Sequence, residues 1–529
     1  MILMRKLRLC FLLALAVFAS MGILVTQAEA LSFFSVKSGD WNDPTVWNQG
    51  VVPDPDTWVS NVIIQNTHTV TLTADAACDD LTINSGGTLT ADTYTLTVSG
   101  NWDSSAGTFT EGTSTVVMTG TTKTLNNDDG FENLTINAGA SVTVETSNVT
   151  ITGDLAINGI LAISDGITVT TLSAAGDDMS IGAAGQLTDA NNAGTFVRLL
   201  VGSTPPITNN NSATGISVNT FRYSLWWLFG TPDTITSTKY GGDLYIQNGP
   251  SDGGEIVQLS AGTLSVTGDL YVQQTNWLVN ANSYVTLDNT ANNADIAVTG
   301  NLIIGTTEGG YTTFNTGSGT VTITGNVTIN NCPSAYNNTL DASANPTINV
   351  GGDWINSDTF TAGTSTVTFN GTGTQSITSG SSPFNTIEIT NSSADVTFLD
   401  NLTATNFTSN TGSVDMKFNA GSTYTITNLT LNGSPGNFIT LGSTSPGTQW
   451  NLNVSGTQSL SYVDVADSNA SGGDTIICAI GCVDIRANND NWAGLVVSIP
   501  TMNEWGMIIF IVLAGIGSIY YLRRKRAVH

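Results

Sequence analysis

Adjacent carboxylates are the residues of this sequence whose type and spacing come closest to catalytic chemistry. A pair of carboxyl groups can divide the roles of general acid and general base, as happens in the cleavage of glycosidic bonds. Three such pairs occur, at Asp79-Asp80, Asp128-Asp129 and Asp177-Asp178. Each stands in a stretch rich in glycine and asparagine, where aspartate is expected because it favours turns. The nearest arginines are Arg198 and Arg222, so we predict no catalytic residues and no enzymatic activity.

Histidine is almost absent. His68 is the only histidine before the terminal residue, His529. A histidine-rich zinc or iron site is therefore excluded, and we predict no metal site and no cofactor. A Ser-His-Asp triad would have to use His68, whose surroundings at Asn66–Val70 look like a strand edge with a solvated side chain.

An aromatic segment at residues 205–232 interrupts the pattern of the chain. It begins with two prolines and contains Arg222, Tyr223, Trp226 and Trp227. One interpretation is a protruding loop whose rings stack on sugars. The other, which we favour, is an insert whose aromatic side chains bury against the rest of the protein, because burial of aromatic area is strongly favourable.

The cysteines allow one local cross-link. Cys478 and Cys482 are close enough in sequence for a disulfide if the protein lies in an oxidising compartment. The spacing alone leaves this open, because disulfide geometry is not set by sequence separation. Cys78 and Cys332 are expected to be buried as small apolar residues.

The charge balance excludes one class of partner. Between residues 31 and 499 there are seven Lys or Arg against 39 Asp or Glu, a net charge of −32. Binding to a nucleic-acid backbone needs clustered cations, so we expect no nucleic-acid partner. Abundant Thr, Asn, Ser and Gly, with alternating apolar residues, indicate a folded β protein rather than a disordered one.

A short phrase recurs along residues 91–498: a β-rich run, a glycine, an asparagine or aspartate, and an apolar residue. It occurs at Gly100-Asn101-Trp102, Gly153-Asp154-Leu155, Gly242-Asp243-Leu244, Gly268-Asp269-Leu270, Gly300-Asn301-Leu302, Gly325-Asn326-Val327 and Gly352-Asp353-Trp354. The last four steps are 26, 32, 25 and 27 residues. Glycine and Asn/Asp tolerate left-handed backbone, so we expect each phrase to mark a bend.

This period predicts the fold. Repeats of 20–50 residues are typical of solenoids, in which each turn buries its inner face on its neighbours. We therefore predict an all-β, right-handed parallel β-helix over residues 91–498. The alternative is a string of tandem β-sandwich domains, which need repeats near 100 residues and antiparallel strands.

Residues 31–90 differ from the repeats. They contain Gly39-Asp40-Trp41, Thr45-Val46-Trp47 and Asp56-Thr57-Trp58. Over residues 33 to about 90 this segment resembles the start of many large bacterial surface β-helix proteins. We expect a capping segment whose tryptophans cover the end of the solenoid, because a solenoid end exposes strand edges and core.

The first thirty residues predict export. Arg5, Lys6 and Arg8 precede an apolar run, Leu9–Val25, and Ala28-Glu29-Ala30 fits a signal-peptidase site. We therefore interpret residues 1–30 as a secretory signal peptide.

The C-terminal segment, residues 499–526, combines a short motif, an apolar run and a basic cluster. The motif is Ile499, Pro500, Thr501 and Met502, followed by Trp505 and Gly506. Trp505–Leu522 carries no charge and has the length of a minimal transmembrane helix. Arg523, Arg524, Lys525 and Arg526 then predict a cytoplasmic C-terminus.

This arrangement resembles the IPTL-CTERM protein-sorting tail of Gram-negative bacteria, with Met502 where that family usually has leucine. The resemblance implies processing by an exosortase-like membrane transpeptidase, with the body outside the cytoplasm. Two hypotheses follow. The protein is an exported structural or adhesin-like surface or matrix protein, anchored or sorted through its tail, with surface glycans as candidate partners. Alternatively, it is a carbohydrate-binding or carbohydrate-active β-helix protein.

Overall fold

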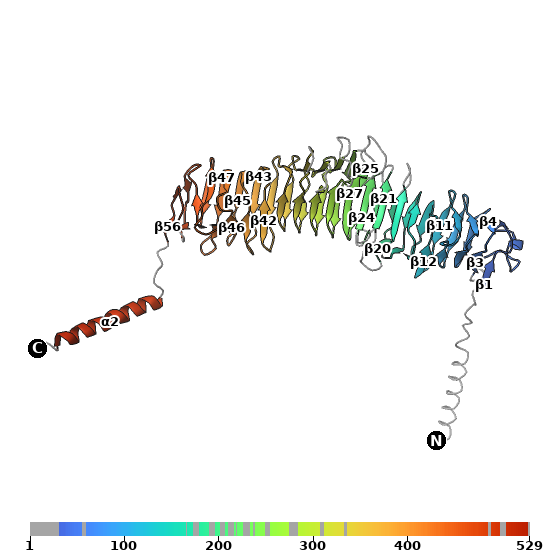
Figure 1. The fold of residues 1–529 in the computed structure, drawn as a ribbon, viewed down its shortest axis with the longest axis horizontal. Coiled ribbons are helices and arrows are strands. Elements are labelled where there is room, and N and C mark those ends of the chain that lie inside the picture. Colours follow the sequence, from blue (N-terminus) through green and yellow to red (C-terminus); the bar gives the residue numbers. More distant parts are fainter. Residues whose placement is uncertain are drawn as a thin grey trace, which may run out of the picture. The chain divides into compact units, whose positions relative to one another are not determined.

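In the computed structural model, β-strands are the main secondary structure of the chain (Figure 1). It describes all residues except 1–30, 55–59, 165–166, 173–178, 190–195, 202–206, 210–215, 218–219, 226–232, 236–237, 249–253, 275–283, 307–310, 333–335, 485–487, 498–503 and 527–529. The chain divides into two compact units. The first comprises Met1–Thr322 and Ile329–Asp341, and the second comprises Ile323–Thr328 and Ala342–His529.

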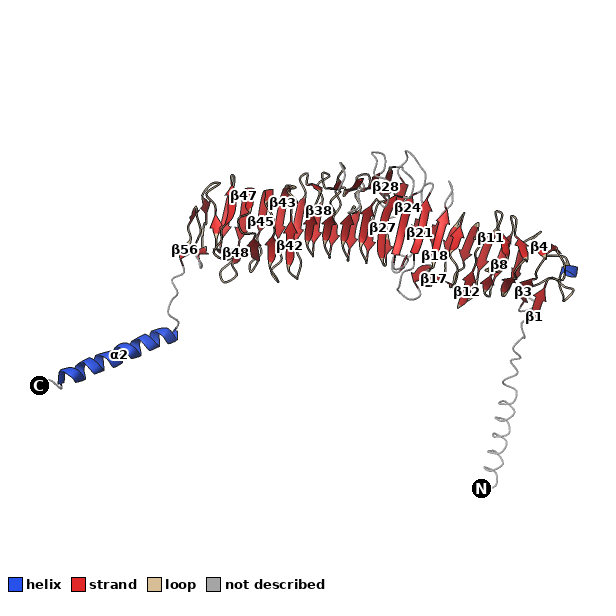
Figure 2. Cartoon of the chain, viewed as in Figure 1, coloured by secondary structure: helices blue, strands red, loops and turns tan. Residues whose placement is uncertain are grey.

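The sheets in both units are parallel, and their strands are short (Figure 2). Each strand pairs with a strand one repeat later in the sequence, as Val142 in one strand faces Leu161 in the next. This is the pairing that a coiled repeat produces. It is inconsistent with tandem sandwiches, whose strands pair antiparallel.

The strand residues alternate between core and solvent as the sequence pattern predicts. In Ser141–Val144 the two valines are buried while Ser141 and Thr143 are not, and Val142 and Val144 stack on Leu161 and Ile163 of the next repeat. Because the strands are in register, each inward column becomes a continuous apolar core. The Thr and Ser columns face outward.

The first unit contains five parallel sheets, numbered I to V. Sheet I consists of β1 (Leu31–Phe34), β3 (Ser60–Ile64), β6 (Leu81–Ile83), β9 (Trp102–Asp103), β12 (Lys123–Asn126), β14 (Ser141–Val144), β17 (Ile160–Ile163), β20 (Gln186–Asp189), β23 (Ile216–Ser217), β26 (Lys239–Tyr240), β29 (Thr263–Val266) and β32 (Asp295–Val298). Sheet II consists of β2 (Gly39–Asp40), β4 (Thr69–Thr71), β7 (Thr88–Thr90) and β10 (Thr108–Thr110). Sheet III consists of β5 (Ala76–Cys78), β8 (Thr95–Val98), β11 (Thr115–Met118), β13 (Asn133–Ile136), β16 (Leu155–Ile157), β19 (Met179–Ile181) and β22 (Ile207–Asn209).

Sheets IV and V belong to the later part of the first unit. Sheet IV consists of β15 (Val149–Ile151), β18 (Thr168–Leu172), β21 (Phe196–Val201), β24 (Thr220–Leu225), β27 (Asp243–Asn248), β30 (Leu270–Gln273) and β33 (Leu302–Ile304). Sheet V consists of β25 (Asp233–Ile235), β28 (Glu255–Leu259), β31 (Tyr284–Asp288), β34 (Tyr311–Asn315) and β37 (Asn338–Asp341). Strands β35 (Val321–Ile323) and β36 (Val327–Ile329) contribute residues to both units.

The second unit is built in the same way, and most of its strands belong to two groups of parallel strands, VI and VII. Sheet VI consists of β38 (Thr347–Val350), β41 (Thr366–Phe369), β43 (Phe384–Ile389), β45 (Leu402–Ser409), β47 (Thr423–Asn432), β49 (Trp450–Val454), β50 (Gln458–Ser461) and β52 (Ser468–Asn469). Sheet VII consists of β39 (Trp354–Asn356), β42 (Gln375–Thr378), β44 (Val396–Phe398), β46 (Asp415–Phe418), β48 (Ile439–Ser443), β51 (Val463–Val465), β54 (Val483–Asp484) and β56 (Val496–Val497). Three further strands are β40 (Thr359–Thr361) and the pair β53 (Ile476–Ile477) and β55 (Trp492–Ala493).

The opening segment contains a short 3₁₀ helix, η1 (Pro44–Val46). The Asp43 side chain accepts a hydrogen bond from the Thr45 backbone N–H at 2.9 Å, which starts the helix. Trp41 and Trp47 are buried edge to face, with ring centroids 5.1 Å apart, and Trp47 Nε1 donates to the Trp41 carbonyl at 2.7 Å. These two tryptophans therefore pack as core residues, while Trp58 lies outside the described residues.

The tail contains one helix, α2 (Glu504–Arg526), over the stretch where the sequence predicts a membrane span. Its described apolar side chains are exposed, for example Phe510 at 62% and Leu513 at 62%. Within the described part of the chain, however, no helix is both long and apolar enough to cross a membrane. The spanning role predicted for Trp505–Leu522 is therefore not supported. Ile499 to Met502 lie outside the described residues.

Candidate functional site

The first carboxylate pair serves the stack of strands rather than a catalytic groove. Asp80 Oδ1 accepts hydrogen bonds from the Asn101 backbone N–H at 2.7 Å and from Asn101 Nδ2 at 3.1 Å. Asp79 Oδ1 accepts from Ser99 Oγ at 3.0 Å. Both partners lie one repeat later, so the pair connects two successive turns of the chain.

In the second pair, Asp129 is engaged with the backbone. Asp129 Oδ2 accepts a hydrogen bond from the Phe109 backbone N–H at 2.5 Å. Its own N–H donates to Asn127 Oδ1 at 2.9 Å, as in a side-chain-capped turn. The third pair, Asp177 and Asp178, lies outside the described residues.

The same contact recurs at the repeated Gly-Asx phrase. In the first unit Asp243 Oδ1 accepts from the Asp269 N–H at 2.8 Å, and Asp269 Oδ1 accepts from the Asn301 N–H at 2.7 Å. In the second unit Asn326 Oδ1 accepts from the Asp353 N–H at 2.7 Å. We call this series of side-chain-to-backbone bonds between equivalent positions of successive repeats the Asx ladder.

The Asx ladder also explains the glycine that precedes each Asx. A Cβ at Gly268 would lie 2.2 Å from Asp243 Oδ1, and one at Gly300 would lie 2.3 Å from Asp269 Oδ1. The side chain of one repeat thus occupies the space in which the next repeat would place its Cβ. The prediction that these positions need glycine for a left-handed backbone is wrong, because neither Gly268 nor Gly300 has a positive φ. Close approach is what requires glycine here.

The surroundings of Asp243 disfavour the ionised form of its carboxyl group. Burial raises the pKa of Asp243, with the hydrogen bond from the Asp269 backbone opposing this shift and the Asp269 charge adding to it. At Asp43, the N-cap residue of η1, the hydrogen bonds from Thr45 lower the pKa of the carboxyl, although that group is exposed. No cation contributes to the shift at Asp243. A general acid or base must reach the substrate atom whose proton it transfers, whereas Oδ1 of Asp243 and of Asp269 is occupied by a backbone N–H.

The salt bridges among the described residues do not involve the carboxylate pairs. Two salt bridges occur in the described part of the chain, Lys37 Nζ to Asp43 Oδ2 at 3.3 Å and Lys417 to Asp395, and neither involves the three carboxylate pairs. Arg198 and Arg222 occupy opposite positions on neighbouring strands β21 and β24.

The single body histidine contacts a serine, which calls for comparison with a catalytic dyad. His68 Nδ1 and Ser35 Oγ are 2.8 Å apart. Ser35 is 1% exposed, and its hydroxyl oxygen also accepts the Gln65 N–H at 2.8 Å. A nucleophilic serine must reach its substrate, which a fully buried hydroxyl cannot do. His68 is therefore partly buried and hydrogen-bonded, which corrects the prediction of a solvated side chain.

The side chains of the predicted sugar-stacking residues, Tyr223, Trp226 and Trp227, all lie outside the described part of the structure. Residues 207–209, 216–217 and 220–225 form β22, β23 and β24, which pair with their neighbours in the stack. The backbone of Tyr223 pairs in register with Ile246 of β27. Trp226 and Trp227 lie outside the described residues.

Two other tyrosines were not singled out from the sequence. Tyr245 and Tyr271 face each other in β27 and β30, with parallel rings whose centroids are 4.1 Å apart. Tyr271 Oη also hydrogen-bonds to Asp269 Oδ2 at 3.1 Å. The repeated strings Gly-Asp-Leu-Tyr-Ile-Gln and Gly-Asp-Leu-Tyr-Val-Gln carry the signal for this pair. Because each ring covers a face of the other, the stack stabilises the repeats and offers little open ring face to a sugar.

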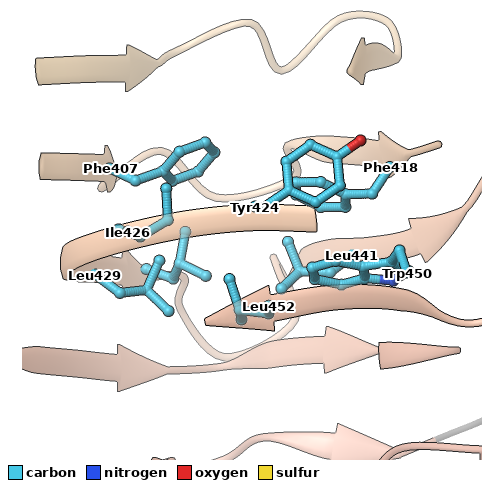
Figure 3. Close-up of a pocket in the computed structure, with 9 residues that line it drawn as sticks. Phe407, Phe418, Tyr424, Ile426, Leu429, Leu441, Trp450 and Leu452 are labelled. Atoms are coloured by element: carbon cyan, nitrogen blue, oxygen red, sulfur yellow. The ribbon is translucent and has the colours of Figure 1, made fainter. Parts of the chain in front are cut away.

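Two hollows among the described residues lack the combination of groups that catalysis needs. A small cavity in the second unit is lined only by apolar and aromatic side chains, including Phe407, Tyr424 and Trp450 (Figure 3). Its volume of about 10 Å³ is at the lower limit for a single water. An open cleft of about 600 Å³ in the first unit has Asp54 and Asp75 among its described lining residues, and these lining residues include no Lys, Arg or His.

The cysteines divide as their positions suggest. Cys478 and Cys482 form a disulfide, with Cα atoms 6.1 Å apart, in the last turns of the second unit. Cys78 and Cys332 are buried. Burial, with smaller contributions from Asp79 and Asp80, raises the pKa of the Cys78 thiol. In the described residues no group of three His, Cys, Asp or Glu side chains is arranged to hold a metal ion.

No family model, no curated protein and no solved structure matches this chain. Its function is therefore inferred from its own geometry and from its termini.

Proposed function

We propose that the protein is an exported, non-catalytic structural or adhesin-like component of the cell surface or matrix. Its body is a right-handed parallel β-helix, and its tail is an IPTL-CTERM-like sorting signal handled by an exosortase-like enzyme. The observation that carries the non-catalytic part is the Asx ladder, since carboxylates that could have taken part in acid-base chemistry instead accept backbone N–H groups of the next repeat.

Two further features support export. The Cys478–Cys482 disulfide suits an oxidising compartment outside the cytoplasm. The exposed apolar side chains of α2 form a surface that is usually covered by a membrane or a protein partner. We infer that the membrane and the processing enzyme are the partners of this tail.

Cell fractionation tests the proposal by comparing the full chain with a shortened one. The full chain should be found outside the cytoplasm, in the envelope or at the surface. A chain lacking 505–526 should be released into the periplasm or medium. If the shortened chain stays with the membrane fraction, the role given to the tail is wrong.

A second variant separates sorting from retention. Replacing Pro500 and Thr501 by alanine leaves α2 intact, so this chain should remain in the membrane fraction without C-terminal processing. Mass spectrometry of the mature C-terminus reads this out. Normal processing of the Pro500→Ala/Thr501→Ala chain would exclude the motif as the recognition element.

A further inference from the structure

One part of the second unit is uncharged in an otherwise acidic protein. Between Phe418 and Val463 the sequence contains no Asp, Glu, Lys or Arg, whereas residues 31–499 carry a net charge of −32. These residues form β47, β49 and β50, and β45 beside them is also free of charged residues. The outward side chains of these four strands are all Thr, Asn, Ser or Gln. We call this surface the uncharged face.

The uncharged face is a regular array. Thr403 faces Thr425, and Thr425 faces Asn453, on three consecutive parallel strands. Strands in a sheet are about 4.8 Å apart, so equivalent side chains repeat at that interval across the strands. A face of this kind offers the same pair of hydroxyl and amide groups several times in a row.

Some side chains of the uncharged face are held by hydrogen bonds to one another. Asn428 Nδ2 donates to Asn406 Oδ1 at 2.9 Å, and Thr457 Oγ1 donates to Asn428 Oδ1 at 2.8 Å. This ladder holds the amides in place. Beside it, Thr403, Thr405, Thr425 and Thr427 are exposed, and in the described residues their hydroxyls make no hydrogen bond within the chain. These hydroxyls can each donate one hydrogen bond and accept others.

The negative charge of the body limits which ligands can bind the uncharged face. A polyanionic glycan would be repelled by the acidic body. A second copy would bring two bodies of the same large negative charge side by side, which is also unfavourable. A neutral polysaccharide meets neither cost, and its hydroxyl groups match a surface that supplies both donors and acceptors.

We propose that the uncharged face binds a neutral polysaccharide chain through the exposed hydroxyls of β45 and β47. This inference rests on the proposed surface function, because it names the partner that such a protein would hold. The regular spacing lets one polymer make the same contact repeatedly, so that weak individual bonds combine.

The experiment uses the purified full chain in mild detergent. Retention is measured on insoluble cellulose and xylan as neutral probes, with polygalacturonate as the polyanionic comparison. The test variant is Thr425→Val with Thr427→Val, which removes two exposed hydroxyls at nearly constant shape. The matched control is Thr108→Val with Thr110→Val on β10, where two threonines have the same spacing and are also exposed.

We expect the full chain and the β10 control to bind at least one neutral probe and not polygalacturonate. The β47 variant should bind about thirtyfold more weakly, the loss expected for two hydrogen bonds. Circular dichroism should show that all three chains are folded alike. Absence of binding to both neutral probes, or equal binding by the β47 variant, overturns the inference.

Self-association is the remaining outcome. If sedimentation shows that the full chain dimerises and that the β47 variant does not, the uncharged face is an interface between copies and the polysaccharide assignment is wrong. Binding is measured on purified protein, whereas export is measured by fractionation. Failure of one is therefore distinguishable from failure of the other.

Discussion

Replacing Gly352 by alanine should destabilise the second unit, because the Asx ladder leaves no room for a side chain there. A Cβ at Gly352 would lie 2.3 Å from Asn326 Oδ1 and 2.6 Å from the Gly325 carbonyl carbon. Overpacking usually costs about 1–3 kcal/mol, and displacing Asn326 would also weaken its 2.7 Å bond to the Asp353 N–H, worth about 1 kcal/mol. We therefore expect a loss of about 2–4 kcal/mol.

Gly442→Ala is the matched control in the same unit. Gly442 lies inside β48, has no positive φ, and a Cβ there would meet nothing within 4 Å. Alanine should therefore be neutral or stabilise by up to about 1 kcal/mol, through the lower entropy of the unfolded chain. Both variants replace glycine by alanine, so the difference between their changes in stability measures the effect of the close contact with Asn326.

Hydrogen exchange with mass spectrometry is the appropriate assay, because stacked repeats need not unfold in a single step. Amides of Asp353 and β39 should exchange roughly 30 to 1000 times faster in Gly352→Ala, as the expected free energy implies. The double variant Asn326→Ala/Gly352→Ala should lose less stability than the sum of the single variants. Equal protection in Gly352→Ala and Gly442→Ala would refute the explanation of the repeated glycine.

Three further predictions concern other parts of the structure. Replacing both Cys478 and Cys482 by serine should cost about 2 kcal/mol, as expected for a short closed loop, with faster exchange confined to β53–β56; unchanged protection there would contradict this. Asp243→Asn should stabilise the protein at pH 7, because burial raises the pKa of Asp243 and asparagine keeps the Oδ1 acceptor. The gain in stability should disappear when denaturation is measured at a pH well below 3.8, the ordinary pKa of aspartate. At such a pH the aspartate is protonated in both the folded and the unfolded state. Trp450→Ala should cost about 3–5 kcal/mol in chemical denaturation, because the ring is fully buried and stacks on Phe418 at 4.1 Å; near-wild-type stability would show that the stack is not tightly packed.

Much of the β architecture was readable from the sequence because the pattern repeats. The Gly-Asx phrase and the alternation of apolar residues predicted a parallel β protein in which each turn buries its inner face. The repeat length varies more than the phrase suggested, since paired positions are 26 residues apart at Leu244 and Leu270 but 19 apart at Val142 and Leu161. The reason for the glycine was not readable. It depends on which side chain of the preceding repeat lies above it, and that is a property of the stack rather than of the local sequence.

The aromatic residues show where sequence reasoning stopped. At Tyr223 the flanking residues alternate poorly, so the strand register was not evident from the sequence, whereas the structure pairs Tyr223 with Ile246 of β27. Tyr245 and Tyr271 are different, because each follows Gly-Asp-Leu and is flanked by buried apolar residues. A tyrosine at the equivalent position of two adjacent repeats is therefore a signal, present in the sequence itself, for a stacked pair.

The acidity of the body is separable from its fold. In the Asx ladder Asp243 and Asn326 perform the same task, since each presents one Oδ1 atom to a backbone N–H of the next repeat. Aspartate adds a charge that this bond does not need and, at Asp243, one that burial disfavours. Across the uncharged face only the neutral residue is used, at Asn406 and Asn428. The distribution of Asp and Asn therefore marks which surfaces repel and which can be approached, and it links the net charge of the body to the partner that we propose.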